Sequence, residues 1–178
     1  VGGGIRSLGN ATIVNSTISG NESTGWYGGA FFLTDGIVDM VNSTVADNVS
    51  PAGGPAAVFV GTFSDASATL NLVNSVVANN VNEGCFLAPF GAGPVAINSL
   101  GNNVFSDGTC FPVASDQVVG DALLGPLADN GGPTETHALL LGSPSIDAAD
   151  NAFCPVTDQR SVARDAFCDA GAFEFQFP

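Results

Sequence analysis

The sequence contains no lysine and only three arginines against 17 acidic residues, so its formal net charge is −14 at pH 7. Because so few cations cannot neutralise a row of phosphates, we expect neither nucleic-acid binding nor electrostatic attachment to an anionic membrane. No apolar run approaches the roughly 20 residues of a membrane-spanning helix, so membrane insertion is not expected. Charged residues make up only 11% and hydrophobic residues 45%, which excludes disorder driven by charge repulsion.

The length of 178 residues suits one domain with a sizeable core, and 23 glycines with 10 prolines imply many turns. The chain begins with Val1 and shows no signal peptide, which predicts a processed or excised segment. Composition thus indicates a globular domain without indicating a reaction.

The first half of the chain is repetitive. Val-Asn-Ser cores begin at residues 14, 41 and 73, with spacings of 27 and 32 residues. Glycine-rich stretches at residues 2–5, 28–31 and 53–56 open the units. Within a unit, as in residues 69–72, apolar and polar side chains alternate with the period of 2 that is typical of a half-buried strand. A repeat of this length built from β-type segments indicates a solenoid.

These patterns predict an all-β fold, a parallel β-helix, with coils stacked about 4.8 Å apart. We place the coils over residues 1–123 and an irregular C-terminal cap of the same domain over 124–178, where it would protect the strand edges at an end of the solenoid. Asparagines at the bends would form two ladders, each amide bonding to the next coil: Asn15, Asn42 and Asn74 in one, and Asn21, Asn48 and Asn80 in the other. The alternative is a β-sandwich in which these are ordinary turn residues.

Four cysteines in an acidic chain without lysine suggest disulfides formed in an oxidising place. Three pairings are open from sequence alone. We predict Cys85–Cys110 and Cys154–Cys168, because each pair closes a local loop. A zinc site is the competing interpretation, but the sequence has no Cys-X-X-Cys motif and its one histidine, His137, lies far from both pairs.

From Leu124 onward, the sequence changes character. It reads Gly-Gly-Pro-Thr-Glu-Thr-His-Ala-Leu at 131–139, Thr-Asp-Gln-Arg at 157–160 and Cys-Asp-Ala-Gly-Ala-Phe-Glu at 168–174. These residues resemble the C-terminal signature of the choice-of-anchor Q family of secreted bacterial proteins. The resemblance implies a right-handed parallel β-helix with a closing segment of this kind, located at the cell surface, and it implies no reaction. Together with the predicted disulfides, we expect a disulfide-tied C-terminal cap. Ser161 stands where the family usually has glycine, so we expect a different turn there.

Parallel β-helices often carry polysaccharide lyases and hydrolases, which need clustered carboxylates. The candidates, none of them a tight pair in sequence, are Asp35, Asp39, Asp47 and Asp65. We interpret His137 as a hydrogen-bonded cap residue. Arg160 and Arg164 we interpret as structural ion-pair residues among Asp158, Asp165 and Asp169. No calcium-binding spacing or regular threonine array is present, so we expect no catalytic residue, no bound metal and no cofactor.

The sequence therefore predicts a non-catalytic structural or adhesive protein, secreted to a bacterial surface. Its expected partners are other copies of itself, joined head-to-tail into a filament or surface layer, with surface glycans as a further candidate. The assembly contact would join the open first coil to an apolar-faced tail strand through Val1, Ile5, Phe173, Phe175 and Phe177. Alternatives are a monomeric surface module and a carbohydrate-active β-helix enzyme. Outer-turn sequons that could carry glycans are Asn10, Asn21 and Asn48.

Overall fold

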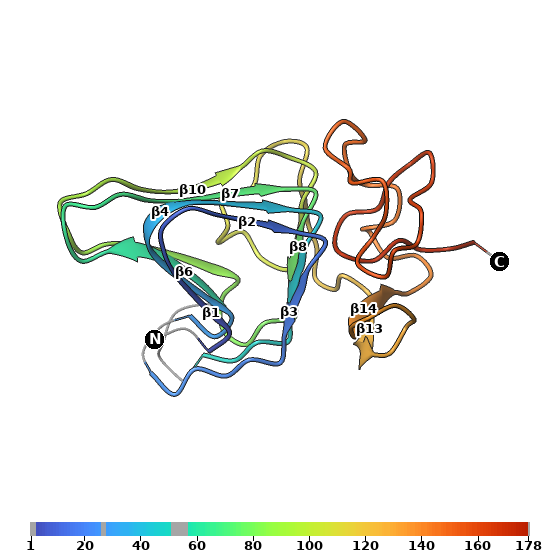
Figure 1. Cartoon of the computed structure of the whole chain (residues 1–178), viewed down its shortest axis with the longest axis horizontal. Helices are drawn as coiled ribbons and strands as arrows, with labels where there is room; N and C mark the ends of the chain where they lie inside the picture. The colour runs from blue at the N-terminus through green and yellow to red at the C-terminus, as the bar shows by residue number, and fades with distance from the viewer. Residues whose placement is uncertain (1–2, 26–27, 51–56, 178) are drawn as a thin grey trace.

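The computed structural model describes residues 3–25, 28–50 and 57–177, and this part of the chain contains strands and no helix. The strands are stacked as a parallel β-solenoid in which the chain makes about three turns between β1 (Ile5–Leu8) and β9 (Cys85–Pro89). Figure 1 looks along the stack and shows the coils one behind another, enclosing a triangular core. The predicted right-handed parallel β-helix is confirmed.

Each turn contributes strands to three sheets, which we name A, B and C. Sheet A contains β1, the first half of β4 (Phe31–Val41), β6 (Val58–Thr62) and β9. Sheet B contains β2 (Ala11–Val14), the second half of β4, β7 (Ala68–Val73) and β10 (Val95–Ser99). Sheet C contains β3 (Thr17–Ser19), β5 (Thr44–Ala46), β8 (Val76–Ala78), β11 (Val104–Phe105) and β12 (Gln117–Val118).

β4 passes from sheet A to sheet B without interruption because Gly36 allows a sharp bend. Gly36 has φ +84°, and a Cβ on it would lie 2.4 Å from the backbone carbon of Gly9. Only glycine tolerates both the left-handed conformation and this close approach of the preceding coil.

The core lies inside the triangle and follows the alternation expected from the sequence. Along sheet B, the inward rows are in register, with Val38 beside Leu70 and Met40 beside Leu72, and all four side chains are fully buried. Parallel strands in register place like side chains above one another, so the apolar residues of successive repeats form continuous stacks.

The Val-Asn-Ser repeat marks the bend between sheets B and C. Asn15, Asn42 and Asn74 have φ values of 46°, 42° and 52°, and Asn102 in the next coil has 59°. Asparagine is one of the few residues that adopts this left-handed conformation readily. The repeat is therefore a structural requirement of the corner, which explains why it is visible in the sequence.

Both predicted disulfides, Cys85–Cys110 and Cys154–Cys168, are present and no cysteine is free. The sulfurs that the zinc alternative would need as ligands are therefore bonded to one another. The first bridge ties the start of β9 to the loop that follows β11. The second lies within residues 124–177, which we call the closing segment.

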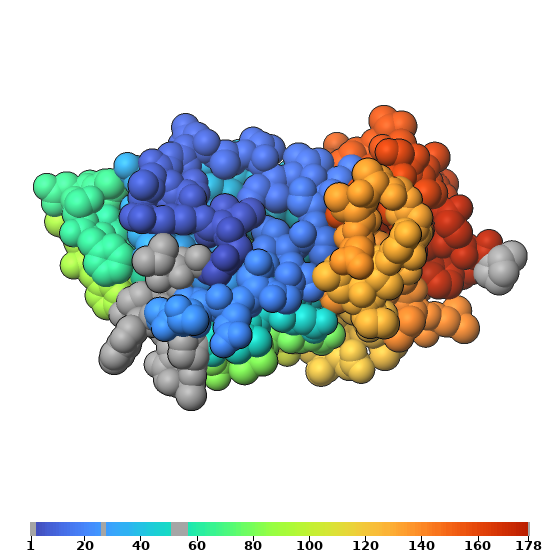
Figure 2. Space-filling model, turned by 60° about the horizontal axis from the view of Figure 1, so that its bottom comes forward, coloured from blue at the N-terminus to red at the C-terminus, as the bar shows by residue number. Residues whose placement is uncertain are grey.

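The closing segment lies beside the solenoid and does not cover its end, contrary to our expectation. In Figure 1 it is the orange and red part to the right of sheet C, and its only described strands form a hairpin of β13 (Leu124–Ala128) and β14 (Thr136–Leu139). Figure 2 shows the orange part against the blue first coil. The end of the stack is instead occupied in part by β12, which pairs with the outer edge of β11. The segment packs laterally because, in each coil, a polar side chain at the corner between sheets B and C donates a hydrogen bond to it.

The expected tail strand is wrong. Residues 173–177 form no strand, Glu174 is fully buried, and Phe173 is only 8% exposed, with the Arg160 guanidinium 3.5 Å from its ring centroid. Burial decreases along the tail instead of alternating, and Glu174 lies inside because it forms an ion pair with Arg164 of the same segment, described below. Phe175 and Phe177 contact each other edge-to-face. Val1 of the predicted assembly contact lies outside the described residues, and Ile5 is 36% exposed on β1.

Candidate functional site

The corner between sheets B and C is bound to the closing segment at every coil. Four asparagine amides donate to backbone carbonyls of the segment: Asn15 to Thr157, Asn42 to Asp169, Asn74 to Asp150 and Asn102 to Ala148, at 2.6 to 3.0 Å. Each coil of the solenoid is thus bound to the same closing segment. We call this set of contacts the corner clamp.

The corner clamp replaces most of the first predicted ladder. Only the Asn74 amide also bonds to the next asparagine, reaching Asn42 Oδ1 at 3.3 Å. The second ladder is continuous, since Asn21 Nδ2 donates to Asn48 Oδ1 and Asn48 Nδ2 to Asn80 Oδ1, both at 3.0 Å.

The second ladder corrects one expectation about glycosylation. Asn48 is fully buried and its amide also donates to two backbone carbonyls, so it is not on an outer turn. The Asn21 amide is engaged in the same ladder. Asn10 is exposed, and its Oδ1 accepts a hydrogen bond from the Ile37 backbone at 2.8 Å.

A third ladder, which involves the serines of the Val-Asn-Ser repeat, was not predicted from the sequence. The backbone N–H groups of Ser16, Ser43 and Ser75 donate to Ser43 Oγ, Ser75 Oγ and Asn103 Oδ1 in turn, and Asn103 N–H donates to Asp116 Oδ1. The serine of each Val-Asn-Ser repeat thus links adjacent coils. The repeat itself was the available signal for this role.

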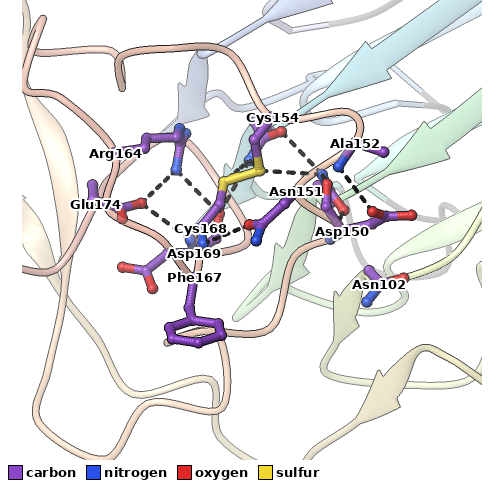
Figure 3. The surroundings of a disulfide bond; sticks show 12 residues. Asn102, Asp150, Asn151, Ala152, Cys154, Arg164, Phe167, Cys168, Asp169 and Glu174 are labelled. Atoms are coloured by element: carbon purple, nitrogen blue, oxygen red, sulfur yellow. Dashed lines mark hydrogen bonds and ion pairs between the residues drawn. A yellow bond between two sulfur atoms is a disulfide. The ribbon is translucent and has the colours of Figure 1, made fainter.

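A buried charged cluster holds the closing segment together. Glu174 Oε2 lies 2.9 Å from Arg164 Nη1, and Asp158 Oδ2 lies 2.7 Å from Arg160 Nη2. Figure 3 shows Arg164 and Glu174 beside the Cys154–Cys168 disulfide. Arg164 also donates to Asn15 Oδ1, at 3.0 Å, so the cluster is joined to the first coil. The two arginines are in ion pairs, although Arg164 pairs with Glu174 and not with the aspartates considered from the sequence.

Asp169 lies in the same cluster and is 2% exposed. Burial raises the pKa of this carboxyl from 3.8 to about 6. Hydrogen bonds from the Phe175 and Asp147 backbones oppose that rise, and the negative charge of Glu174 adds to it. The cluster binds backbone N–H groups and cations of its own segment, which is a structural role.

His137 joins the β13–β14 hairpin to the first coil. Its Nδ1 lies 2.8 Å from the Gly125 carbonyl oxygen and its Nε2 lies 2.7 Å from Ser19 Oγ. Because a carbonyl only accepts, Nδ1 carries the proton and the Ser19 hydroxyl donates to Nε2 in the neutral ring. Asp47 Oδ2 is 3.9 Å from the same Nε2. Because His137 is 2% exposed, its hydrogen bond with Ser19 lies between two packed elements, the hairpin and the first coil.

The candidate catalytic carboxylates are spread over β4 and two of the segments that follow strands. Asp35 and Asp39 lie on opposite sides of the bend in β4, Asp47 follows β5, and Asp65 lies in the loop after β6. In residues 3–25, 28–50 and 57–177, no group of three or more His, Cys, Asp or Glu is placed to hold a metal ion.

The outer face of sheet B carries a polar row that runs across four strands. Its members are in register: Thr12, Asp39, Asn71 and Asn98. Asn71 Nδ2 donates to Asp39 Oδ1 at 2.7 Å, and Asn98 Nδ2 donates to Asn71 Oδ1 at 2.9 Å. A shallow groove of about 390 Å³ lies over the first two strands, lined by Asn10, Ala11, Thr12, Ile37 and Asp39.

The outer face of sheet A is aromatic. Phe32, Phe59 and Phe86 are in register, with ring centroids 4.7 and 6.0 Å apart. Phe63 and Phe90, from the loops after β6 and β9, stack on each other at 5.4 Å. They are 58% and 55% exposed, and both also stack on Phe59.

Comparisons with known proteins identify no relative: no family model, curated protein or solved structure matches this chain. The resemblance to choice-of-anchor Q domains therefore stays a prediction from the sequence motifs. The function has to be argued from the surfaces and contacts described above.

Proposed function

We propose that this chain is a non-catalytic structural or adhesive module displayed outside the cell at a bacterial surface. The observation that carries the proposal is the corner clamp, through which one lateral segment binds every coil of the solenoid. A solenoid is stabilised by contacts between neighbouring coils, so it unravels from its ends. Because the closing segment binds every coil, it opposes this unravelling. Such resistance suits a rigid element that is exposed to proteases or tension.

The location rests on the disulfides. Both bridges are compatible with an oxidising, extracellular environment. In the described part of the chain, no helix is long and apolar enough to cross a membrane. The formal charge of −14 favours solubility of the separate molecules and disfavours binding to acidic polymers.

Head-to-tail stacking of coils is not part of this proposal. β12 occupies the position in sheet C where the third strand of an added coil would pair. Phe173, which was expected to dock on the first coil, is buried in the closing segment. The runner-up function, a carbohydrate-active enzyme, is less well supported because its four candidate carboxylates are spread over β4, the residue after β5 and the loop after β6.

The proposal predicts that the purified, oxidised chain binds to washed cell envelopes of the organism that produces it. The assay is co-sedimentation over a concentration series, with the reduced and alkylated chain as the control. Saturable binding by the oxidised chain alone is expected. Sedimentation no greater than that of an unrelated acidic protein contradicts an adhesive role.

A further inference from the structure

We infer that the polar row on the outer face of sheet B binds an extended, uncharged polysaccharide. This inference deepens the proposed adhesive function and rests on it. The polar row consists of Thr12, Asp39, Asn71 and Asn98, one residue from each strand of the sheet.

The side chains of the polar row are already fixed. Because Asn98 donates to Asn71 and Asn71 donates to Asp39, every amide in the row has a defined orientation. The chain of bonds uses Asp39 Oδ1 and one N–H of each amide. Asp39 Oδ2, Asn98 Oδ1 and the Thr12 hydroxyl are then available to a ligand. Carboxylate and amide oxygens accept from sugar hydroxyls, and the second amide proton donates to them.

A less polar row runs beside the first. Ile37, Thr69 and Ala96 occupy matching positions two residues earlier on adjacent strands, and Ile37 is 46% exposed. A pyranose ring has hydroxyls around its edge and C–H groups on its faces. A polar row next to a less polar row matches both parts of such a ring, which a purely polar or purely apolar face would not.

The shape of the face favours a polymer over a small molecule. Small-molecule sites are concave and enclose most of their ligand, whereas the groove over Thr12 and Asp39 is shallow and open. The polar row continues beyond this groove onto β7 and β10. With strands about 4.8 Å apart, its four members present about 14 Å of regularly spaced polar groups along the solenoid axis.

Charge and composition separate this ligand from others. Asp39 and the overall charge of −14 would repel an anionic polymer. Protein interfaces usually have an apolar, often aromatic centre, whereas the large apolar side chains exposed on the described strands of this face are two aliphatic ones, Ile37 and, at the end of β2, Val14. The aromatic face of sheet A, by contrast, has the composition of a protein contact. The uncharged polysaccharide is therefore the ligand that fits the polar row.

The test is affinity electrophoresis of the oxidised full chain in native gels that contain one polysaccharide each. The probes are mixed-linkage β-glucan, xylan and galactomannan as uncharged polymers, with polygalacturonate as the anionic one. We expect retardation by at least one uncharged polymer and none by polygalacturonate. Absence of retardation by all three uncharged polymers, or stronger retardation by polygalacturonate, overturns the inference.

Two variants locate the site. Asp39→Val removes the acceptor at the middle of the row but keeps a residue that suits a strand, and Asp65→Val removes an equal charge from an exposed loop. Asp39→Val should weaken the apparent affinity at least tenfold, while Asp65→Val should change it less than twofold. Asn98→Ala, at the exposed edge, should give an intermediate loss. Equal retardation of Asp39→Val and the wild-type chain, with both folded by circular dichroism, places binding elsewhere and refutes the site.

The same variants separate this inference from the proposed function. If wild type and Asp39→Val bind cell envelopes equally and no polysaccharide retards either, adhesion stands and the glycan site is wrong. If the wild-type chain fails to bind envelopes but is retarded by an uncharged polymer in an Asp39-dependent way, the glycan site stands and the proposed surface role is wrong.

Discussion

Asn42 is the position at which the corner clamp is most directly tested. It is fully buried, has φ +42°, donates to the Asp169 carbonyl at 3.0 Å and accepts from Asn74 at 3.3 Å. Asn42→Ala removes both hydrogen bonds and places a side chain with a Cβ but no compensating polar group in the left-handed region. Asn42→Gly removes the same bonds and keeps the backbone unstrained.

The two variants separate the energetic contributions. Two lost hydrogen bonds cost about 2 kcal/mol, and glycine adds roughly 0.5 kcal/mol through the entropy of the unfolded chain. Asn42→Gly should therefore lower the free energy of unfolding by about 2.5 kcal/mol. The left-handed backbone costs alanine about 1–2 kcal/mol, so Asn42→Ala should lower it by about 3–4 kcal/mol.

The assay is equilibrium unfolding in urea with both disulfides intact, using the exposed Ser67→Ala as the control. The control should change stability by less than about 0.5 kcal/mol. If both Asn42 variants stay within that limit, the clamp does not stabilise the solenoid. If they destabilise equally, the argument from backbone conformation is wrong.

Three further predictions concern the closing segment. Replacing Cys154 and Cys168 by serine should lower the free energy of unfolding by about 3 kcal/mol in urea titrations. An unchanged midpoint would show that this disulfide does not stabilise the closing segment. Because the pKa of Asp169 is raised from 3.8 to about 6, its stabilising contribution is complete below pH 3.8 and lost as the pH rises through 6. The stability of Asp169→Asn relative to wild type should therefore improve by about 3 kcal/mol between pH 3.5 and 7.5, and parallel pH profiles would refute this. Ser19→Ala should lower the free energy of unfolding by about 1 kcal/mol through the lost His137 bond, against less than about 0.5 kcal/mol for the exposed Ser67→Ala; equal effects would show that this bond does not join the hairpin to the first coil.

The repeated part of the fold could be predicted from the sequence because its signals are local. The alternation in residues 69–72 reports which side chains face the core, and the Val-Asn-Ser cores report a corner with left-handed backbone. The cysteine pairing was predicted from loop length, since each bridge closes 25 residues or fewer.

The position of the closing segment could not be predicted, because it depends on contacts between distant residues. Asn15 bonds to Thr157, 142 residues later, and nothing near either residue indicates the partner. The burial of Glu174 has the same origin. An alternating apolar pattern at the tail suggested a strand, but the ion pair with Arg164 decides which side chain lies inside.

Ser161 adopts a backbone conformation that is more usual for glycine. We expected a different turn where serine replaces the usual glycine of the resembled family. Ser161 has φ +69°, the left-handed conformation that glycine adopts readily. Its N–H donates to the Asp158 carbonyl, which holds the turn in place. A serine in this conformation carries local strain.

The central claim is that this clamped solenoid functions at the outer surface of the cell. The most direct measurement is labelling of intact producing cells with an antibody against the chain, followed by protease shaving and non-reducing mass spectrometry. The account predicts surface labelling and release of fragments in which Cys85–Cys110 and Cys154–Cys168 are oxidised. Labelling that appears only after lysis, together with four free thiols, would contradict it.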